Sequence, residues 1–120
     1  MPSYGYRRGG ERRRTARVIM SVPVRVDGES MQGEKFTERT TTYTISQHGC
    51  LFVLESDVIL DQALVLMHEY TRQSIQCRVV STRRHRDGKK YVGIEFLPAN
   101  PDFWRMAFSK PGARSLKRFS

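Results

Sequence analysis

Apolar and polar residues alternate along much of this chain, and such alternation is typical of β-strands with one buried face. Between positions 18 and 26, every even-numbered residue is valine or methionine, which predicts a strand over this range. Pro23 cannot donate a ladder hydrogen bond, so the strand is expected at a sheet edge or at a bulge. The pair Asp27-Gly28 is a turn signal and predicts the end of the strand.

The same pattern predicts five further strands. Threonine occupies five of the eight positions from 37 to 44, and β-branched residues favour strand over helix. Asp87-Gly88 marks the tip of a highly charged hairpin. The five strands cover residues 36–46, 50–54, 63–68, 74–82 and 91–97. Six short strands with hairpin-like turns predict an all-β fold, a small antiparallel barrel or sandwich.

A short helix is predicted after the last strand. Asn100 is a good N-cap residue, and Pro101 fits the first helical position. On this helix Phe103, Met106 and Ala107 would share one face, with Trp104 and Phe108 on an adjoining face. A helix that ends before Pro111-Gly112 is too short to be stable alone, so we expect its aromatic side chains to dock on the barrel.

Charge is distributed unevenly along the chain. The 120 residues suffice for one domain with one modest core, and the formal net charge is +9. Residues 1–17 carry +5 and residues 109–120 carry +4, while residues 18–108 are neutral in sum. We therefore predict a flexible arm over residues 1–10, a folded body and a basic tail over residues 109–120. Nucleic-acid-binding domains more often spread their basic residues over a folded face.

Cysteine, histidine and hydropathy patterns exclude several classes of protein. The first ten residues contain no secretory signal, and no stretch is long and apolar enough to span a membrane, which predicts a cytoplasmic protein. Cys50 and Cys77 fall within predicted strands and are expected to be reduced and buried. The three histidines lack the spacing of a metal site, and no nucleophile motif or glycine-rich phosphate loop is present. We predict a protein that is not an enzyme and binds no metal.

Four arginines occupy six consecutive positions directly ahead of the first strand, in the segment Glu11-Arg12-Arg13-Arg14-Thr15-Ala16-Arg17. Like charges this close repel one another, so a solvated basic arm is one interpretation. The other is a binding segment for a planar anion. Guanidinium groups bind phosphate through two parallel hydrogen bonds and stack on aromatic rings.

This segment resembles the RxxxR motif at the start of PilZ domains, the bacterial receptors for cyclic di-GMP, with Arg13 and Arg17 at the two arginine positions. The run Thr44-Ile45-Ser46-Gln47-His48-Gly49 resembles the second motif of that family, (D/N)xSxxG, at Ser46 and Gly49. The last predicted strand, Tyr91-Val92-Gly93-Ile94-Glu95-Phe96-Leu97, resembles the closing strand of the family. The likeness covers roughly residues 11–108.

The resemblance implies a six-stranded antiparallel barrel and a site for cyclic di-GMP formed by Arg12, Arg13, Arg14, Arg17, Thr44, Ser46 and Gly49. Arg13 and Arg17 would bind phosphate or guanine, and Arg12 and Arg14 would add stacking or charge. Ser46 would hydrogen-bond, and Gly49 would let the backbone approach closely. Two positions depart from the family pattern. Thr44 replaces the acidic or amide residue that helps to hold guanine, and Cys50 replaces a second glycine.

Three hypotheses follow from these observations. The first is a cyclic di-GMP receptor whose arginine-rich arm becomes ordered over the ligand and presents a surface to a protein effector. The second, motivated by Thr44, is an interaction module of the same fold that binds no nucleotide. In the third, a barrel with basic arms and aromatic residues such as Tyr4, Tyr6 and Tyr91 binds single-stranded nucleic acid.

Overall fold

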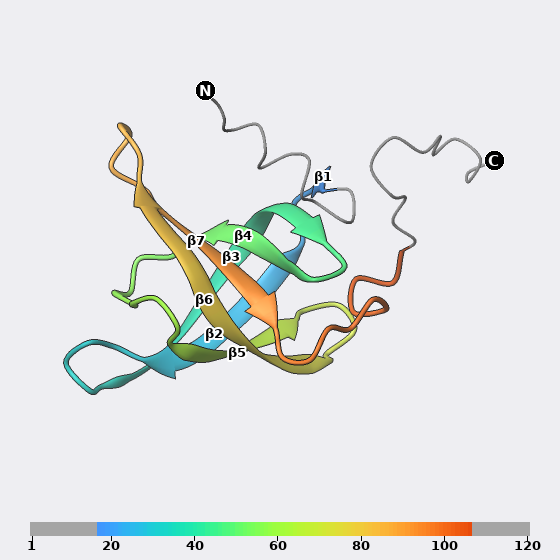
Figure 1. Cartoon of the computed structure of the whole chain (residues 1–120), viewed down its shortest axis with the longest axis horizontal. Helices are drawn as coiled ribbons and strands as arrows, with labels where there is room; N and C mark the ends of the chain where they lie inside the picture. Colours follow the sequence, from blue (N-terminus) through green and yellow to red (C-terminus); the bar gives the residue numbers. More distant parts are fainter. Residues whose placement is uncertain (1–16, 107–120) are drawn as a thin grey trace, which may run out of the picture.

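The computed structural model describes residues 17–106, whose strands close into an antiparallel barrel (Figure 1). The strands are β1 (Val18–Ile19), β2 (Pro23–Glu29), β3 (Lys35–Ser46), β4 (Gly49–Val53), β5 (Ala63–His68), β6 (Ser74–Arg84) and β7 (Lys90–Phe96). They are ordered β1-β3-β2-β5-β6-β7-β4, and pairing of β3 with β4 closes the ring. The two-residue strand β1 lies on β3 outside this ring. The predicted six-stranded barrel is therefore confirmed.

Strand β3 closes the barrel because it pairs with two strands along its length. Its first seven residues, from Lys35 to Thr41, pair with β2, and residues from Thr42 to Ser46 pair with β4. The register with β4 shifts between Thr42 and Thr44. A bulge of this kind bends a strand and increases its twist, which lets one strand turn the corner of a barrel.

The first predicted strand is interrupted, and its predicted end was wrong. Regular ladder pairing with β3 stops after Ile19 and resumes at Pro23, although Met20 and Val22 keep single backbone hydrogen bonds to β3. The buried Thr42 hydroxyl spans this gap, since it accepts a hydrogen bond from the Val22 amide at 2.9 Å and donates one to the Met20 carbonyl at 2.6 Å.

Asp27-Gly28 does not form a turn, because β2 continues to Glu29. A Cβ atom on Gly28 would lie 2.4 Å from Cδ2 of Leu64 and 3.1 Å from Cζ of Phe36, so any larger residue there would have to displace these side chains.

The alternating residues of the strands form one apolar core. Its fully buried members include Val24, Val26, Phe52, Leu54, Leu66, Val79, Val92 and Phe103. Cys50 and Cys77 are buried and unpaired, as expected. Burial raises the pKa of Cys77 to about 12 and that of Cys50 well above its ordinary value, so both thiols stay protonated and unreactive at neutral pH.

The segment after β7 is built from turns where a helix was expected. Residues 101–104 form turns and residues 105–106 a bend, with the Phe103 amide bonded to the Asn100 carbonyl at 3.1 Å. The positive φ of Arg105, 61°, interrupts helical geometry, and residues 17–106 contain no helix. Ala107 and Phe108, at the end of the predicted helix, lie outside the described residues. The expected docking is confirmed, because Phe103 is fully buried and Trp104 is 5% exposed.

Trp104→Ala should lower the free energy of unfolding by roughly 3–5 kcal/mol, because it leaves a large cavity against the barrel. The substitution also removes the hydrogen bond from the Trp104 indole nitrogen to the Ser46 carbonyl at 2.8 Å. Denaturant unfolding of the full chain measures the change. Tyr70→Ala is the matched control, because Tyr70 is 77% exposed and its loss should change stability by less than about 0.5 kcal/mol. Equal effects of the two substitutions would contradict the packing role of Trp104.

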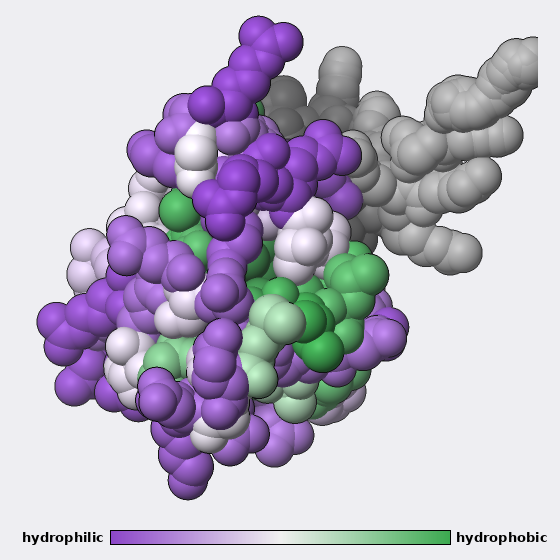
Figure 2. All heavy atoms as spheres, turned by 90° about the vertical axis from the view of Figure 1, so that its left-hand side faces the viewer, coloured by the Kyte–Doolittle hydropathy of each residue, from purple (hydrophilic) through white to green (hydrophobic). Residues whose placement is uncertain are grey.

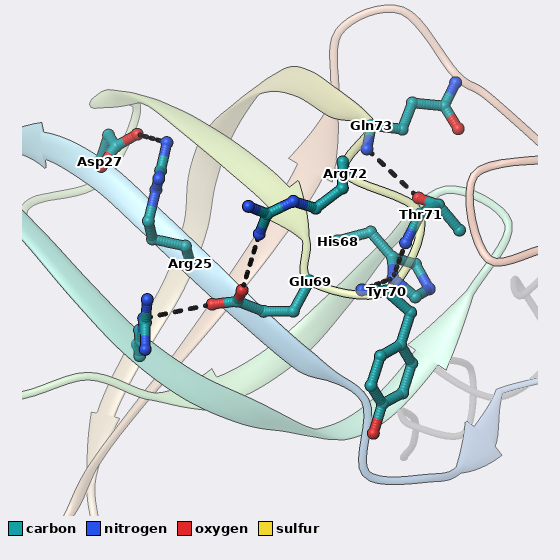
Figure 3. Close-up of polar contacts among 9 residues, drawn as sticks. Arg25, Asp27, His68, Glu69, Tyr70, Thr71, Arg72 and Gln73 are labelled. Atoms are coloured by element: carbon teal, nitrogen blue, oxygen red, sulfur yellow. Dashed lines mark hydrogen bonds and ion pairs between the residues drawn. The ribbon is translucent and has the colours of Figure 1, made fainter.

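His68 is a buried histidine at the turn between β5 and β6 (Figure 3). Its Nδ1 accepts a hydrogen bond from the Tyr70 amide at 3.2 Å, which requires that nitrogen to be unprotonated. The imidazole lies 5.8 Å from the rings of both Phe103 and Trp104. Burial, and secondarily the charge of Arg105, lowers the pKa of His68 below its ordinary value.

Protein stability should therefore fall as the pH drops below about 6.5, where His68 becomes protonated in the unfolded chain but stays neutral in the folded one. His68→Asn retains an acceptor for the turn amides and removes this titration, so its unfolding free energy should depend less on pH. Unfolding curves at pH 7.5 and 5.5 test the difference. His48→Gln, at an exposed position, should keep the wild-type dependence. If His68→Asn keeps the wild-type pH dependence as well, a group other than His68 causes that dependence.

Candidate functional site

Three of the predicted ligand-binding residues line one cavity on the wall of the barrel. Arg17 lies directly ahead of β1, and Thr44 and Ser46 lie near the end of β3. The cavity has a volume of about 110 Å³. Its other lining residues are Ile45, Cys50, Leu51, Ser81 and Gly93. Two sequence motifs separated by more than twenty residues thus meet at one place.

Strand register explains why these residues meet. Thr44 pairs with Leu51, Leu51 pairs with Gly93, and Gly93 pairs with Ser81, so one row crosses β3, β4, β7 and β6. Directly paired residues of a sheet share a face. Their neighbours Ile45, Phe52 and Val92 are buried in the core, so the row faces outward. The same register pairs Ile19 with Thr44 and Val18 with Ile45, so the preceding residue, Arg17, lies at the level of Ser46, two residues beyond the row.

Ser46 is held in place from two sides. Its hydroxyl accepts a hydrogen bond from the His48 amide at 3.2 Å, and its carbonyl accepts one from the Trp104 indole at 2.8 Å. A serine hydroxyl that accepts in this way can still donate to a ligand. The turn that carries the second motif is therefore fastened to the segment after β7.

The charge of the cavity favours an anion. Among its described lining residues, Arg17 is the one charged side chain, and none is acidic. Arg12, Arg13 and Arg14, the other predicted cationic ligands, lie outside the described residues. Thr44 offers a hydroxyl where an acid or amide was expected from the family pattern.

The sequence model described as "PilZ domain" matches residues 11–107. This chain belongs to the PilZ domain family. The predicted family is thus confirmed. PilZ domains are binding modules, not enzymes, and they generally act as receptors for cyclic di-GMP. No curated protein matches the sequence significantly.

Among solved structures, the inhibitor of motility MotI/DgrA of Bacillus subtilis is similar, with a TM-score of 0.58 and 18% identity. The match covers 70% of this chain and 42% of that one, so this chain spans about two fifths of the length of MotI. At this identity the likeness concerns the fold alone, and that fold agrees with the barrel of a PilZ domain.

Gly49, the glycine of the second PilZ motif, has a packing role. It pairs with Ser46 across the β3–β4 turn and is not among the residues that line the cavity. A Cβ atom on Gly49 would lie 1.9 Å from the carbonyl oxygen of Ile94 in β7, a backbone atom that cannot move aside alone. Glycine therefore permits β4 to approach β7, and its predicted contact with a ligand stays a prediction.

Gly49→Ala should destabilise the PilZ domain by about 3 kcal/mol, the upper end for overpacking, because backbone must separate. Thermal or denaturant unfolding measures this without any ligand. Gly33→Ala is a control, since its Cβ would meet nothing within 4 Å, although its φ of 84° is unfavourable for alanine. That control should cost only about 1–2 kcal/mol. A stable Gly49→Ala protein with weakened ligand binding would instead assign Gly49 to the ligand.

Leu51, Ser81 and Gly93 complete the wall of the PilZ cavity and were not predicted as site residues. Gly93 gave a signal, since glycine inside a strand often marks a close approach. A Cβ there would lie 2.5 Å from the Ser81 hydroxyl oxygen. No sequence pattern marks Leu51 and Ser81 as site residues, because only the strand register brings them to the site.

Two further findings concern the part of the chain that the structure describes. Residues 17–106 contain no cluster of three or more His, Cys, Asp or Glu residues that could hold a metal ion. A helix long and apolar enough to cross a membrane is likewise absent from these residues.

Proposed function

We propose that this PilZ domain is a receptor and adaptor for cyclic di-GMP. One observation carries the proposal: Arg17 of the first motif and Thr44 and Ser46 of the second motif line the same outward-facing cavity. Cyclic di-GMP is an anion with two flat guanine bases. A cation, three hydroxyl groups and no acidic side chain among the described lining residues suit such a ligand.

The size of the cavity limits how the nucleotide binds. Pockets that enclose a small molecule usually have volumes of about 300–1,000 Å³. A cavity of about 110 Å³ can receive only one edge of cyclic di-GMP, so most of the ligand must lie outside the barrel. The residues directly ahead of Arg17 are the nearest in sequence that can cover it. Arg12, Arg13 and Arg14 are therefore proposed to close over the bases and phosphates.

Closure of the arm requires several arginines to act together. Fixing one backbone residue costs about 1–2 kcal/mol, and a hydrogen bond to a charged group contributes about 1.5–3 kcal/mol. One arginine contact cannot order the whole segment, whereas several contacts formed with base stacking can. The ordered arm then provides a new surface for a protein effector, which is how the domain would transmit the level of its ligand.

A PilZ-fold interaction module that binds no nucleotide is the second candidate, and Thr44 favours it. A carboxylate or amide oxygen at this position would accept hydrogen bonds from guanine N–H groups. The Thr44 hydroxyl is shorter and uncharged. Absence of nucleotide binding in the wild type would make the fold an interaction surface alone.

Arg17→Ala should weaken cyclic di-GMP binding by about ten- to a hundredfold, since a charged hydrogen bond is worth roughly 1.5–3 kcal/mol. Isothermal titration calorimetry on the full chain measures this. Arg39→Ala is the control, because the Arg39 side chain is 79% exposed and does not line the cavity. It should bind like wild type. Equal affinities of wild type and Arg17→Ala would mean that Arg17 is not a ligand residue.

Thr44→Asp should strengthen binding by about 1–3 kcal/mol, because it supplies the missing guanine acceptor. Thr44→Val, of similar shape but without the acceptor, should give no gain. If wild type binds nothing and Thr44→Asp binds, the interaction module is favoured. Failure of both folded proteins to bind would overturn the receptor proposal.

A further inference from the structure

The net charge of residues 18–108 is zero, but positive charge is concentrated at the turn between β6 and β7. Residues 83–90, around the β6–β7 turn, contain five Arg and Lys residues and one acid. Residues 80–89 are all exposed, and no apolar side chain occurs from Thr82 to Lys90. The hairpin extends beyond the barrel in Figure 1, and Figure 2 shows hydrophilic residues gathered at the same upper end. We call residues 81–90 the basic hairpin.

The basic hairpin is held in a defined shape. Its strands remain paired up to Arg84 and Lys90, and the turn is closed by hydrogen bonds between His85 and both Gly88 and Lys89 at 2.9 Å. Stacking of His85 on Tyr91, with ring centroids 4.1 Å apart, stiffens its middle.

At the root of the basic hairpin, Lys90 binds Asp57 at 2.7 Å, and this contact lowers the pKa of the Asp57 carboxyl group. The cations nearer the tip are different. Within the described chain, Arg83, Arg86 and Lys89 form no ion pair. Their charges therefore remain available to a partner.

One edge of the basic hairpin lacks a strand partner. Pairing of β6 with β5 reaches only Arg78, and the loop before β5 adds two backbone hydrogen bonds to Val79. Beyond that point, none of residues 17–106 forms a strand along the outer edge of residues 81–84. Such an edge presents unpaired N–H and C=O groups and can accept an extended peptide as an added strand.

We infer that the outer edge of β6, from Ser81 to Arg84, docks an extended acidic segment of a partner protein. Main-chain hydrogen bonds to the edge would align the segment, and Arg83, Arg86 and Lys89 would contact its carboxylates. This inference names the partner chemistry for the adaptor role proposed above and rests on that role for its biological meaning. The docking itself needs no nucleotide and is measured without it.

The position of the edge suits an adaptor. Ser81, where the open edge begins, and Gly93, its partner in β7, both line the Arg17 cavity. A ligand in that cavity would therefore touch the root of the basic hairpin. Ligand binding in the cavity and peptide docking on the edge would therefore both involve β6 at Ser81.

Duplex nucleic acid is the competing occupant, because a two-stranded ribbon can enter a major groove. It would use the charges but leave the strand edge unpaired. An acidic peptide uses both the charges and the edge, which favours it.

The test uses the full chain and the capped peptide Glu-Val-Glu-Val-Glu-Val-Glu as the probe. Fluorescence anisotropy measures affinity, and amide NMR spectra locate the contact, expected at residues 81–84. The triple variant Arg83→Gln, Arg86→Gln, Lys89→Gln should bind about tenfold more weakly, because three exposed charge pairs are lost. The matched control Lys35→Gln, Arg39→Gln, Arg72→Gln removes the same charge from β3 and from the β5–β6 turn and should bind like wild type.

A peptide with alternate amides N-methylated along its pairing edge keeps its charges but cannot form the ladder, and it should bind at least about tenfold more weakly. Equal loss in both triple variants, or equal binding of the methylated peptide, would overturn the inference. So would absence of peptide binding, or tighter binding of a 20-base-pair duplex at the basic hairpin. Each of these results is obtained without cyclic di-GMP, so it is independent of the calorimetric test of the nucleotide site.

Discussion

Closure of the barrel depends on the two pairings of strand β3, which joins β2 with its first half and β4 with its second. The bulge between Thr42 and Thr44 lets one strand serve both partners. Closure buries the alternating valines of β2, and it also aligns Thr44, Leu51 and Gly93 in one outward row. The candidate site is thus a by-product of the same register that forms the core.

The second PilZ motif has two physical roles in this structure. Gly49 permits β4 to approach the backbone of β7, and the Ser46 carbonyl accepts a hydrogen bond from the Trp104 indole. Both contacts fix the turn before any ligand arrives, so a ligand at Ser46 would not bear the cost of ordering it.

The outside of the barrel balances charge in one region and leaves it unbalanced in another. On β2, on β3 and in the β5–β6 turn, arginines have acidic neighbours: Arg25 binds Asp27 at 3.2 Å, and Glu69 binds both Arg39 and Arg72 at 3.5 Å (Figure 3). Near the tip of the basic hairpin the one acid is Asp87, whose carboxylate accepts a hydrogen bond from the Lys89 amide at 2.9 Å and forms no ion pair within the described chain. Exposed charge along an open strand edge discourages self-association of the barrel, and it also selects partners of opposite charge.

The sequence by itself determined the approximate positions of the strands, the family and the burial of Phe103 and Trp104. Strand alternation and the spacing of the two PilZ motifs are local patterns, so they could be read before any contact was known. The Arg17 end of the site was also predicted. Its other wall was not, because Leu51 and Ser81 reach it only through register.

Contacts between distant residues decided the rest. Gly28 looked like a turn residue, but it lies within β2, where its small size leaves room for the Leu64 side chain from far along the chain. The interruption after Ile19 depends on the hydroxyl of Thr42, and the turns and bend at residues 101–106 replaced a helix with good local signals. Local sequence sets the preference of a segment, whereas steric fit and hydrogen bonds to distant strands select which conformation survives in the folded protein.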